Sequence, residues 1–502
     1  MITRSLYFSL VIVLMMSCLS VSDVVAQTDI ETFRQKQQED FKRFRNKNQN
    51  DYKAFRKRIN DEYAAFVERI WKEYKVFKGV PLPDEPAPVP PIVMPEEDKN
   101  KPIEDQPVII EEVVQPIVPE PQPDPIVPVE PQPQPVNKHT IVFYGTSVGV
   151  SLDATNSFAL KNLDEVSIAD AWRIMGDGRF DAMVSDCLEM RRKLHLSDWA
   201  YLQMLNELAT SFWGGQKNEA TLMTAYVYSQ SGYKMRLAKT DTRIVMLYAS
   251  KHQIFGKSYF VLDDKDTYYY IMGDQNVDGL LICQASFPSE KSMSLCFREN
   301  PLFTTCTTTV KNRKSINTEL ECATVSDEHL LNYYSTYPSS MLNDNPMTRW
   351  AIYANTPLSN VAKETLYPQL KQAMAALTQT EKVMVLLDWV QNAFVYEYDD
   401  KVWGDDRAFF ADESLYYPYC DCEDRSILFT RMVRDLIGLP CLLVYYPGHL
   451  AAAVCLDEKV NGDYIMVGNK RFVVCDPTYI NAPIGATMPG MDNSSAKVIV
   501  LE

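Results

Sequence analysis

The sequence predicts an α+β fold, and two stretches of the chain carry this prediction. In residues 422–475, apolar residues recur at helical spacing up to Leu436, Gly438 then stops the helix, and three short apolar runs follow as strands. Residues 218–272 show the same order, with a helix that Gly232 stops before four strands. The chain has 502 residues, so we expect more than one domain.

Residues 1–26 have the pattern of a signal peptide. Arg4 precedes an apolar run over residues 6–16, and Val24-Val25-Ala26 fits a signal-peptidase site. The apolar run is too short for a comfortable transmembrane span. We therefore expect an exported protein, periplasmic or secreted. Lipid anchoring through Cys18 is the less favoured alternative, because a Leu is usual three residues before such a Cys and this chain has Met15 there.

Residues 27–80 predict one long helix. Between residues 29 and 78 there is neither Pro nor Gly, and aromatic residues recur every eleven positions in two series: Phe33, Phe44, Phe55, Phe66, Phe77, and Phe41, Tyr52, Tyr63, Tyr74. Eleven residues are close to three helical turns, so both series form one stripe along the helix. The stripe favours self-association as a coiled coil. Docking on another protein or on the cell envelope is the second interpretation, and a lone helix is the third.

Residues 81–137 form a Pro-rich linker that holds 18 of the 30 prolines of the chain. Pro-x-Pro spacing favours the extended polyproline conformation, which makes a semi-rigid spacer. At about 3.1 Å per residue, the segment is expected to reach on the order of 150 Å. A spacer is favoured over a ligand for a proline-reading domain.

Two α+β domains are expected after the linker, over residues 138–345 and 346–502. The first is rich in predicted helices. Its Asn218-Glu219-Ala220 stands where Cys422-Glu423-Asp424 stands in the second, so the first domain is a candidate for a degenerate copy without a nucleophile. The alternative is that a helix followed by a strand meander is a common arrangement and carries no ancestry.

The second domain carries the parts of a thiol nucleophile site. Cys422 falls in the first turn of the predicted helix, where the helix dipole favours a thiolate. His449 follows Pro447-Gly448, opens a predicted strand and is the single histidine after Cys422. Asp476 ends a neighbouring predicted strand. A cysteine, a histidine and an aspartate arranged in this way supply a nucleophile, a base and a carboxylate that orients the base.

Three motifs carry a resemblance: Cys422-Glu423-Asp424-Arg425-Ser426, then Gly448-His449, then Asp476-Pro477-Thr478. In this order they resemble the core of the transglutaminase-like superfamily, relatives of papain-type cysteine proteases, over roughly residues 380–480. The wider segment from residue 353 onward is similar to transglutaminase-like proteins of Bacteroidetes. The resemblance implies a papain-like core with Cys422, His449 and Asp476 as its triad. It also implies amide hydrolysis or transamidation, and bacterial members lean to hydrolysis.

Several details of this site stay open at the level of sequence. Cys420 is the rival nucleophile, but it has Cys where the motif asks for Asp two residues later. The N–H of Cys422 is the natural first oxyanion donor. Papain-type enzymes place a Gln upstream as second donor, whereas Gln391 lies far upstream on a predicted helix, so we expect the donor among three aromatic residues, Trp403, Tyr417 or Tyr419. We also expect a lowered pKa for Cys422, with the helix and His449 outweighing the acidic neighbours.

Composition narrows the classes of function. The net charge of −16 argues against a nucleic-acid partner. Paired CxxC motifs and a calcium loop are both absent from the sequence, so we predict no metal and no cofactor. The sequence therefore predicts an exported thiol-dependent amide hydrolase or acyltransferase that acts on a protein or peptide. The alternative is a non-enzymatic peptide-binding or envelope-binding protein with a fossil triad.

Overall fold

The structure is a computed structural model that describes residues 51–502, apart from residues 52, 84–85, 100, 127–137, 263, 274–276 and 405. The predicted signal peptide, Cys18 and the aromatic repeat up to residue 50 lie outside the described residues. The chain divides into two compact units, residues 1–62 and 63–502. Over the described residues, the structure contains no helix of the length and apolarity that a bilayer crossing requires.

The predicted long helix ends earlier than its sequence pattern indicates. Helical backbone stops at residue 67, and strand β1 (Trp71–Lys75) follows, so the prediction of helix up to residue 78 is wrong. Tyr63 is buried and its ring stacks on Phe287 at 4.4 Å. β1 joins a sheet by pairing with β12 (Gly279–Cys283). The last part of the aromatic repeat is therefore used inside the second unit, where tertiary partners override the helical pattern.

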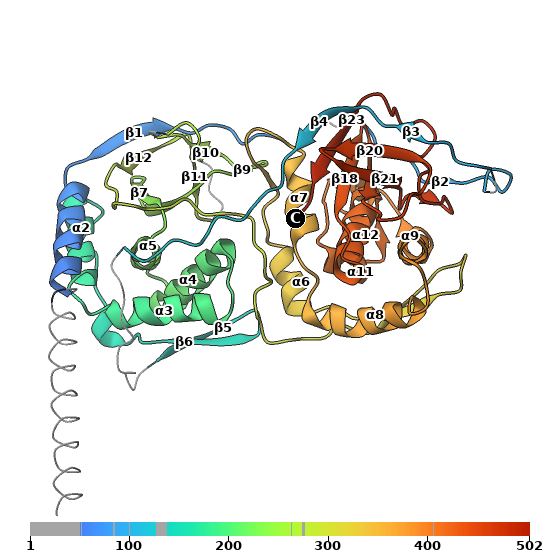
Figure 1. The fold of residues 1–502 in the computed structure, drawn as a ribbon. Coiled ribbons are helices and arrows are strands. Elements are labelled where there is room, and N and C mark those ends of the chain that lie inside the picture. The colour runs from blue at the N-terminus through green and yellow to red at the C-terminus, as the bar shows by residue number, and fades with distance from the viewer. Residues whose placement is uncertain are drawn as a thin grey trace, which may run out of the picture. The chain divides into compact units, whose positions relative to one another are not determined.

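The first α+β domain holds a six-stranded sheet in the order β1-β12-β7-β8-β11-β10, in which every neighbouring pair is antiparallel. Helices α3, α4 and α5 lie on one side of this sheet (Figure 1). In chain order, residues 138–345 contain β5 (His139–Phe143), β6 (Thr146–Val150), α2 (Glu165–Met175), α3 (Asp181–Lys193), α4 (Asp198–Trp213), α5 (Lys217–Gln230), β7 (Met235–Lys239), β8 (Ile244–Ser250), β9 (Gln253–Ile254), β10 (Tyr259–Phe260), β11 (Tyr268–Ile271), β12, β13 (Lys311–Lys314), β14 (Glu321–Thr324), α6 (Glu328–Tyr334) and β15 (Ser340–Met341). Of these, β13 and β14 pack on helices α9 (Gln379–Ala393) and α8 (Asn360–Ala373), which come later in the chain.

The second α+β domain is built on a seven-stranded sheet in the order β3-β20-β21-β19-β18-β23-β4. Helix α12 packs on β18 and β19, and Gly438 ends it at φ +79°. Its elements are α7 (Thr348–Asn355), α8 (Asn360–Ala373), α9 (Gln379–Ala393), β16 (Val395–Tyr396), α10 (Asp399–Val402), α11 (Ala411–Tyr416), β17 (Tyr419–Cys420), α12 (Cys422–Leu436), β18 (Cys441–Tyr446), β19 (His449–Val454), β20 (Asp463–Val467), β21 (Lys470–Cys475), β22 (Tyr479–Ile480) and β23 (Ala496–Val500).

The two sheets share one strand order. If the sheet strands after α5 and after α12 are numbered along the chain, both sheets read 3-4-2-1-5. All of these pairings are antiparallel in both domains. A strand from before the domain then extends each sheet beyond its fifth strand, β1 in the first and β4 (Ile110–Val114) in the second. This agreement in topology fits the hypothesis of a degenerate copy, and common ancestry stays a prediction.

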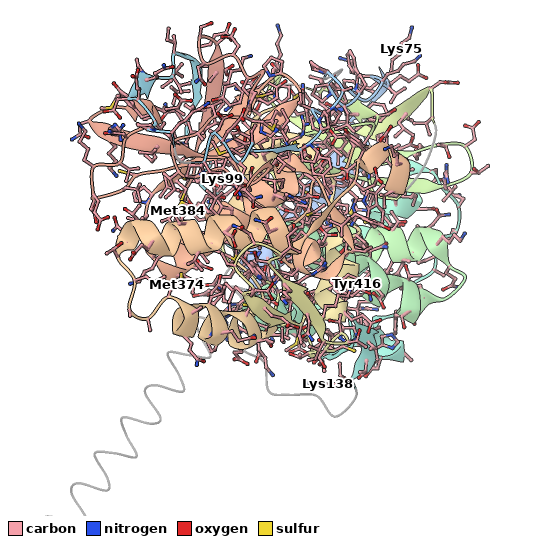
Figure 2. The ribbon with its side chains drawn as sticks, turned by 90° about the vertical axis from the view of Figure 1, so that its right-hand side faces the viewer. Lys75, Lys99, Lys138, Met374, Met384 and Tyr416 are labelled. Atoms are coloured by element: carbon pink, nitrogen blue, oxygen red, sulfur yellow. The ribbon has the colours of Figure 1, made fainter. Side chains whose placement is uncertain are left out.

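The described part of the Pro-rich segment, up to residue 126, differs from the free spacer that the sequence predicts. β2 (Ile92–Val93) pairs with β22, β3 (Gln106–Pro107) with β20, and β4 with β23, all in parallel. Short apolar runs between the prolines are free to pair at sheet edges, where proline is tolerated. We call residues 86–94 the strap. Figure 2 labels Lys99, just past the strap, and Met384 on α9.

Candidate functional site

Cys422 is the first residue of α12 and is 4% exposed. The Asp421 side chain caps the helix by accepting hydrogen bonds from the N–H groups of Glu423 (3.2 Å) and Asp424 (3.4 Å). The predicted position of Cys422 at a helix start is thus confirmed. Among the described residues, Cys422 lines a cavity of about 230 Å³ and Cys420 does not. The rival cysteine is buried in β17 instead.

His449 is the first residue of β19, and its ring is held by Asp476. The distance from His449 Nε2 to Asp476 Oδ2 is 2.8 Å, which confirms the predicted contact. Asp476 Oδ1 accepts hydrogen bonds from the N–H groups of Thr478 (2.8 Å) and Tyr479 (3.2 Å), so the carboxylate is fixed on both sides. His449 Nδ1 is buried and has no hydrogen-bond partner among the described residues. With Nε2–H directed at Asp476, Nδ1 is the ring nitrogen that remains for proton transfer.

Cys422 and His449 lie on the wall of the same cavity. The main-chain N–H of Leu450, the residue after His449, donates a hydrogen bond to the Cys422 sulfur. The start of α12 therefore lies directly against the start of β19. This arrangement sets a thiol beside a histidine whose far nitrogen already contacts a carboxylate, as nucleophilic catalysis by cysteine requires.

The residues that follow Cys422 in the motif hold neighbouring loops in place. Arg425 is buried and donates hydrogen bonds to the main-chain carbonyls of Phe394 (2.8 Å) and Gln391 (3.2 Å). Ser426 Oγ donates to the carbonyl of Leu450 at 2.8 Å and so ties α12 to β19. The Cys-x-Asp-x-Ser pattern alone does not reveal these tasks, because the partners are main-chain atoms of distant segments.

Gln391 positions the loop that carries Asp476. Its Nε2 donates to the carbonyls of Asp476 (3.0 Å) and Ala482 (3.1 Å), and its Oε1 accepts from the N–H of Asn481 (3.1 Å). Both ends of the buried amide are thus used by the protein itself. Gln391 is therefore a positioning residue, and its amide is already committed to this loop rather than to an oxyanion.

Carboxyl groups crowd the cavity. Burial is the largest cause that raises the pKa values of Asp421 and Glu423 above their ordinary range, and neighbouring carboxylates add to it. The carboxylate oxygens of Asp399, Asp406 and Glu423 lie within 4.8 Å of one another, and Arg349 contacts Asp406 at 3.1 Å. Such a set of oxygen atoms is suited to a hard cation. Asp399 and Asp406, which precede α11 in the chain, thus contribute carboxylates to the cavity.

The pKa of Cys422 runs against the sequence-based prediction. Burial of the thiol raises its pKa well above the ordinary value, Asp421 and Glu423 raise it further, and the hydrogen bond from Leu450 only partly opposes them. The prediction of a lowered pKa is therefore wrong. A helix start and a histidine were expected to dominate, but the fold removes the sulfur from water and surrounds it with acids. Burial and the neighbouring acids therefore favour the neutral thiol.

The predicted aromatic oxyanion donors lie away from the cavity. Among the described residues that line it, Trp403, Tyr417 and Tyr419 are absent. Trp403 packs on Tyr417, with ring centroids 4.8 Å apart, and Tyr419 is 40% exposed. Tyr396, which the sequence did not single out, does not line the cavity either. Its hydroxyl is buried without a hydrogen-bond partner among the described residues. Burial raises its pKa, and a negative charge on the nearby Cys422 sulfur would raise it further.

The strap lies across this site. Val89 N–H donates a hydrogen bond to the carbonyl of Gly448 at 2.9 Å, one residue before His449. Pro86 and Pro88 line the same cavity as Cys422. Gly448 has φ +76°, and a Cβ atom there would lie 2.8 Å from the carbonyl oxygen of Ala87. Glycine at this position therefore permits both the turn and the close approach of the strap.

The first domain lacks the chemical groups at the matching places. Asn218, the second residue of α5, accepts a hydrogen bond through Oδ1 from the N–H of Ile244 at 2.8 Å. Ile244 is the first residue of β8, so the helix start and the strand start meet as they do in the second domain. An amide replaces the thiol and an apolar residue replaces the histidine. At these two matching places, the thiol and the histidine therefore occur in the second domain and not in the first.

Comparison with known proteins adds no relative. No family model matches the chain. The curated proteins and the solved structures give no match either. The resemblance to the transglutaminase-like superfamily therefore rests on the three sequence motifs.

Proposed function

We propose that this protein is an exported thiol-dependent amide hydrolase or acyltransferase with a papain-like core. One observation carries the proposal: Cys422, at the start of α12, shares a cavity with His449, whose other ring nitrogen contacts Asp476 at 2.8 Å. Each of the three groups supplies one requirement of acyl transfer: a nucleophile, a base and an anion that orients the base.

The reaction begins from the neutral thiol. His449 Nδ1 takes the thiol proton as the Cys422 sulfur forms a bond to the amide carbonyl carbon. Asp476 stabilises the imidazolium that results and holds the ring orientation. The imidazolium then gives its proton to the leaving nitrogen, the C–N bond breaks, and a thioester remains on Cys422. Water or an amine attacks the thioester, His449 removes its proton, and the acyl product leaves as the thiol is restored.

Negative charge on the carbonyl oxygen needs donors. The N–H of Cys422 is the first, because the first N–H groups of a helix have no partner within the helix. We assign the second to the hydroxyl of Tyr396, which is buried, has no hydrogen-bond partner among the described residues and is electrostatically coupled to the Cys422 sulfur. A donor that is already free of water and of other partners loses little by turning to the oxyanion.

A non-enzymatic peptide-binding protein is the second candidate. Two observations favour it: the chain's own strap lines the cavity, and burial raises the pKa of the Cys422 thiol. In that case the triad would hold its geometry without turnover. Measured turnover of a substrate that fits the cavity separates the two candidates.

The test uses p-nitrophenyl acetate, a small activated ester, with and without cadaverine as acceptor amine. The full chain should release p-nitrophenolate with repeated turnover, and the product, acetate or acetylcadaverine, identifies a hydrolase or a transferase. Cys422→Ala and His449→Ala should each lower turnover by about 10³-fold or more, while Cys420→Ala should leave it nearly unchanged. Turnover that survives Cys422→Ala would overturn the proposal.

A further inference from the structure

The strap contacts one motif segment of the candidate site and the strand that directly follows another. Val89 N–H donates to Gly448, which precedes His449. β2 then pairs in parallel with β22, which begins three residues after Asp476. Met94 N–H completes this pairing by donating to the carbonyl of Ile480 at 2.9 Å. These contacts join main chain to main chain, and the side chains of Val89, Ile92 and Met94 also pack in an apolar cluster with Tyr479 and Met488. The surface that receives the strap therefore recognises an extended backbone together with the order of its apolar side chains.

The side chains of the strap suit the cavity that they cover. Residues 86–94 read Pro-Ala-Pro-Val-Pro-Pro-Ile-Val-Met and carry no charge. Pro86 and Pro88 face a cavity that Asp399, Asp406 and Glu423 also line. Glu423 is 7% exposed, and its Oε1 has no hydrogen-bond partner among the described residues. A carboxylate on the strap would lose its hydration beside these buried acids, whereas an apolar side chain, or a basic one that pairs with them, would be accepted.

We propose that the cleft beside Cys422 binds an extended polypeptide through the main chain of Gly448 and of β22, and that the strap is its resident occupant. The ligand class is therefore an unfolded or extended polypeptide segment, uncharged or basic where it crosses the cavity. Only the role of that ligand as a substrate rests on the proposed function. An incoming segment displaces the strap and exposes the cavity, so the strap also limits access to Cys422.

Two variants at one strap residue test the proposal in the full chain. Pro88 is exposed on its outer side, so its replacement leaves the core intact. Pro88→Glu places a carboxylate against the acidic cavity and should release the strap, whereas Pro88→Lys should retain it. A fluorescein-labelled peptide of residues 86–95 should then bind Pro88→Glu at least about tenfold more tightly than the unaltered chain or Pro88→Lys. Fluorescence anisotropy measures the binding, and a scrambled peptide of equal composition is the control.

Two further measurements keep the test decisive if Pro88→Glu does not fold. Val89→Pro removes the N–H that Gly448 accepts, and Val118→Pro, at an exposed valine of the same Pro-rich segment, is its matched control. In the unaltered chain, excess free peptide should accelerate hydrogen exchange at the N–H groups of Val89 and Met94. Exchange there that is fast without peptide, or unchanged by saturating peptide, would overturn the proposal.

The outcomes for binding and for chemistry are separate. Saturable peptide binding without turnover of the ester upholds this inference and defeats the proposed function. Ester turnover that depends on Cys422, with no saturable peptide binding to either strap variant, defeats this inference and leaves the proposed function standing. Equal affinity for the scrambled peptide also defeats it, because recognition would then not depend on the order of residues in the strap.

Discussion

The charge around Cys422 is set by single residues. Asp421 is the N-cap of α12 and the first charge, after burial, that raises the pKa of the neighbouring thiol. An asparagine keeps an oxygen that can cap the helix but removes the charge. Asp421→Asn should therefore lower the pKa of Cys422. A decrease of about one pKa unit gives about ten times more thiolate, so iodoacetamide should label Cys422 about tenfold faster.

The control for this prediction is another buried acid. Asp412→Asn lies outside the cavity and should leave the labelling of Cys422 unchanged. Peptide mapping by mass spectrometry separates Cys422 from partly exposed cysteines such as Cys306 and Cys455, which are free. An Asp421→Asn variant that labels no faster at Cys422 would show that burial alone controls the thiol.

The hydroxyl of Tyr396 allows a second test of a single group, its role as an oxyanion donor. Tyr396→Phe removes a hydroxyl that has no hydrogen-bond partner among the described residues. If this hydroxyl stabilises the oxyanion, turnover of p-nitrophenyl acetate should fall by about 10²-fold. The free energy of unfolding should change by less than about 0.5 kcal/mol, because the variant loses no existing hydrogen bond. Unchanged turnover would remove Tyr396 from the mechanism, and Tyr417→Phe, at a hydroxyl that contacts Arg407, is the control.

Some elements were predictable from sequence because their signal is local. The apolar spacing and the Gly438 stop predict α12, and the three strand runs correspond to β18, β19 and β21. Cys422, His449 and Asp476 follow from the motifs at their ends. The strap and β1 were not predictable, because short segments adopt strand only through distant partners, Ile480 for Val93 and Cys283 for Trp71.

The electrostatics of the site were missed for a related reason. A sequence shows that acids are near Cys422 along the chain, but not that Asp399 and Asp406 return to Glu423 in space. The sequence also gives no measure of burial, which is the largest cause that raises the pKa of the thiol. Gln391 was noticed as an upstream glutamine, yet its contact with the Asp476 loop appears only in three dimensions.

Two buried acids on helix α11, Asp412 and Glu413, lead us to predict an unusual dependence of folding stability on pH. Burial raises the pKa of Asp412 to about 6 and that of Glu413 to about 7. The folded state then holds more protons than the unfolded state between the ordinary carboxyl pKa and these raised values, so stability falls as pH rises through that window. Asp412 contributes on the order of 2–3 kcal/mol to this fall.

The thermal midpoint should accordingly be lower at about pH 8 than at about pH 5. Asp412→Asn should flatten the dependence, because its amide does not titrate. Differential scanning calorimetry across the pH series measures both. A midpoint that rises steadily from pH 5 to pH 8 in the unaltered protein would contradict the raised pKa values, since ordinary exposed carboxylates give that behaviour.

For the molecule as a whole, the two domains share a strand order but differ in the groups at the helix start and the strand start. The first domain keeps the contact between helix start and strand start through Asn218 and Ile244, without thiol or histidine. Asn218→Ala should lower the free energy of unfolding by about 1 kcal/mol, the worth of one hydrogen bond. Ester turnover should be unaffected, because the reacting groups belong to the second domain. A loss of turnover without a loss of stability would instead tie the first domain to the chemistry.

The most direct measurement of the central claim is the location of the acyl group. The full chain is mixed with p-nitrophenyl acetate, quenched in acid within one turnover and digested for peptide mapping by mass spectrometry. We predict a thioester acetyl group on Cys422 that forms much more slowly in His449→Ala and is absent from the denatured chain. Acetylation that falls first on Cys306 or Cys455, or that proceeds at Cys422 equally fast without His449, would contradict the account.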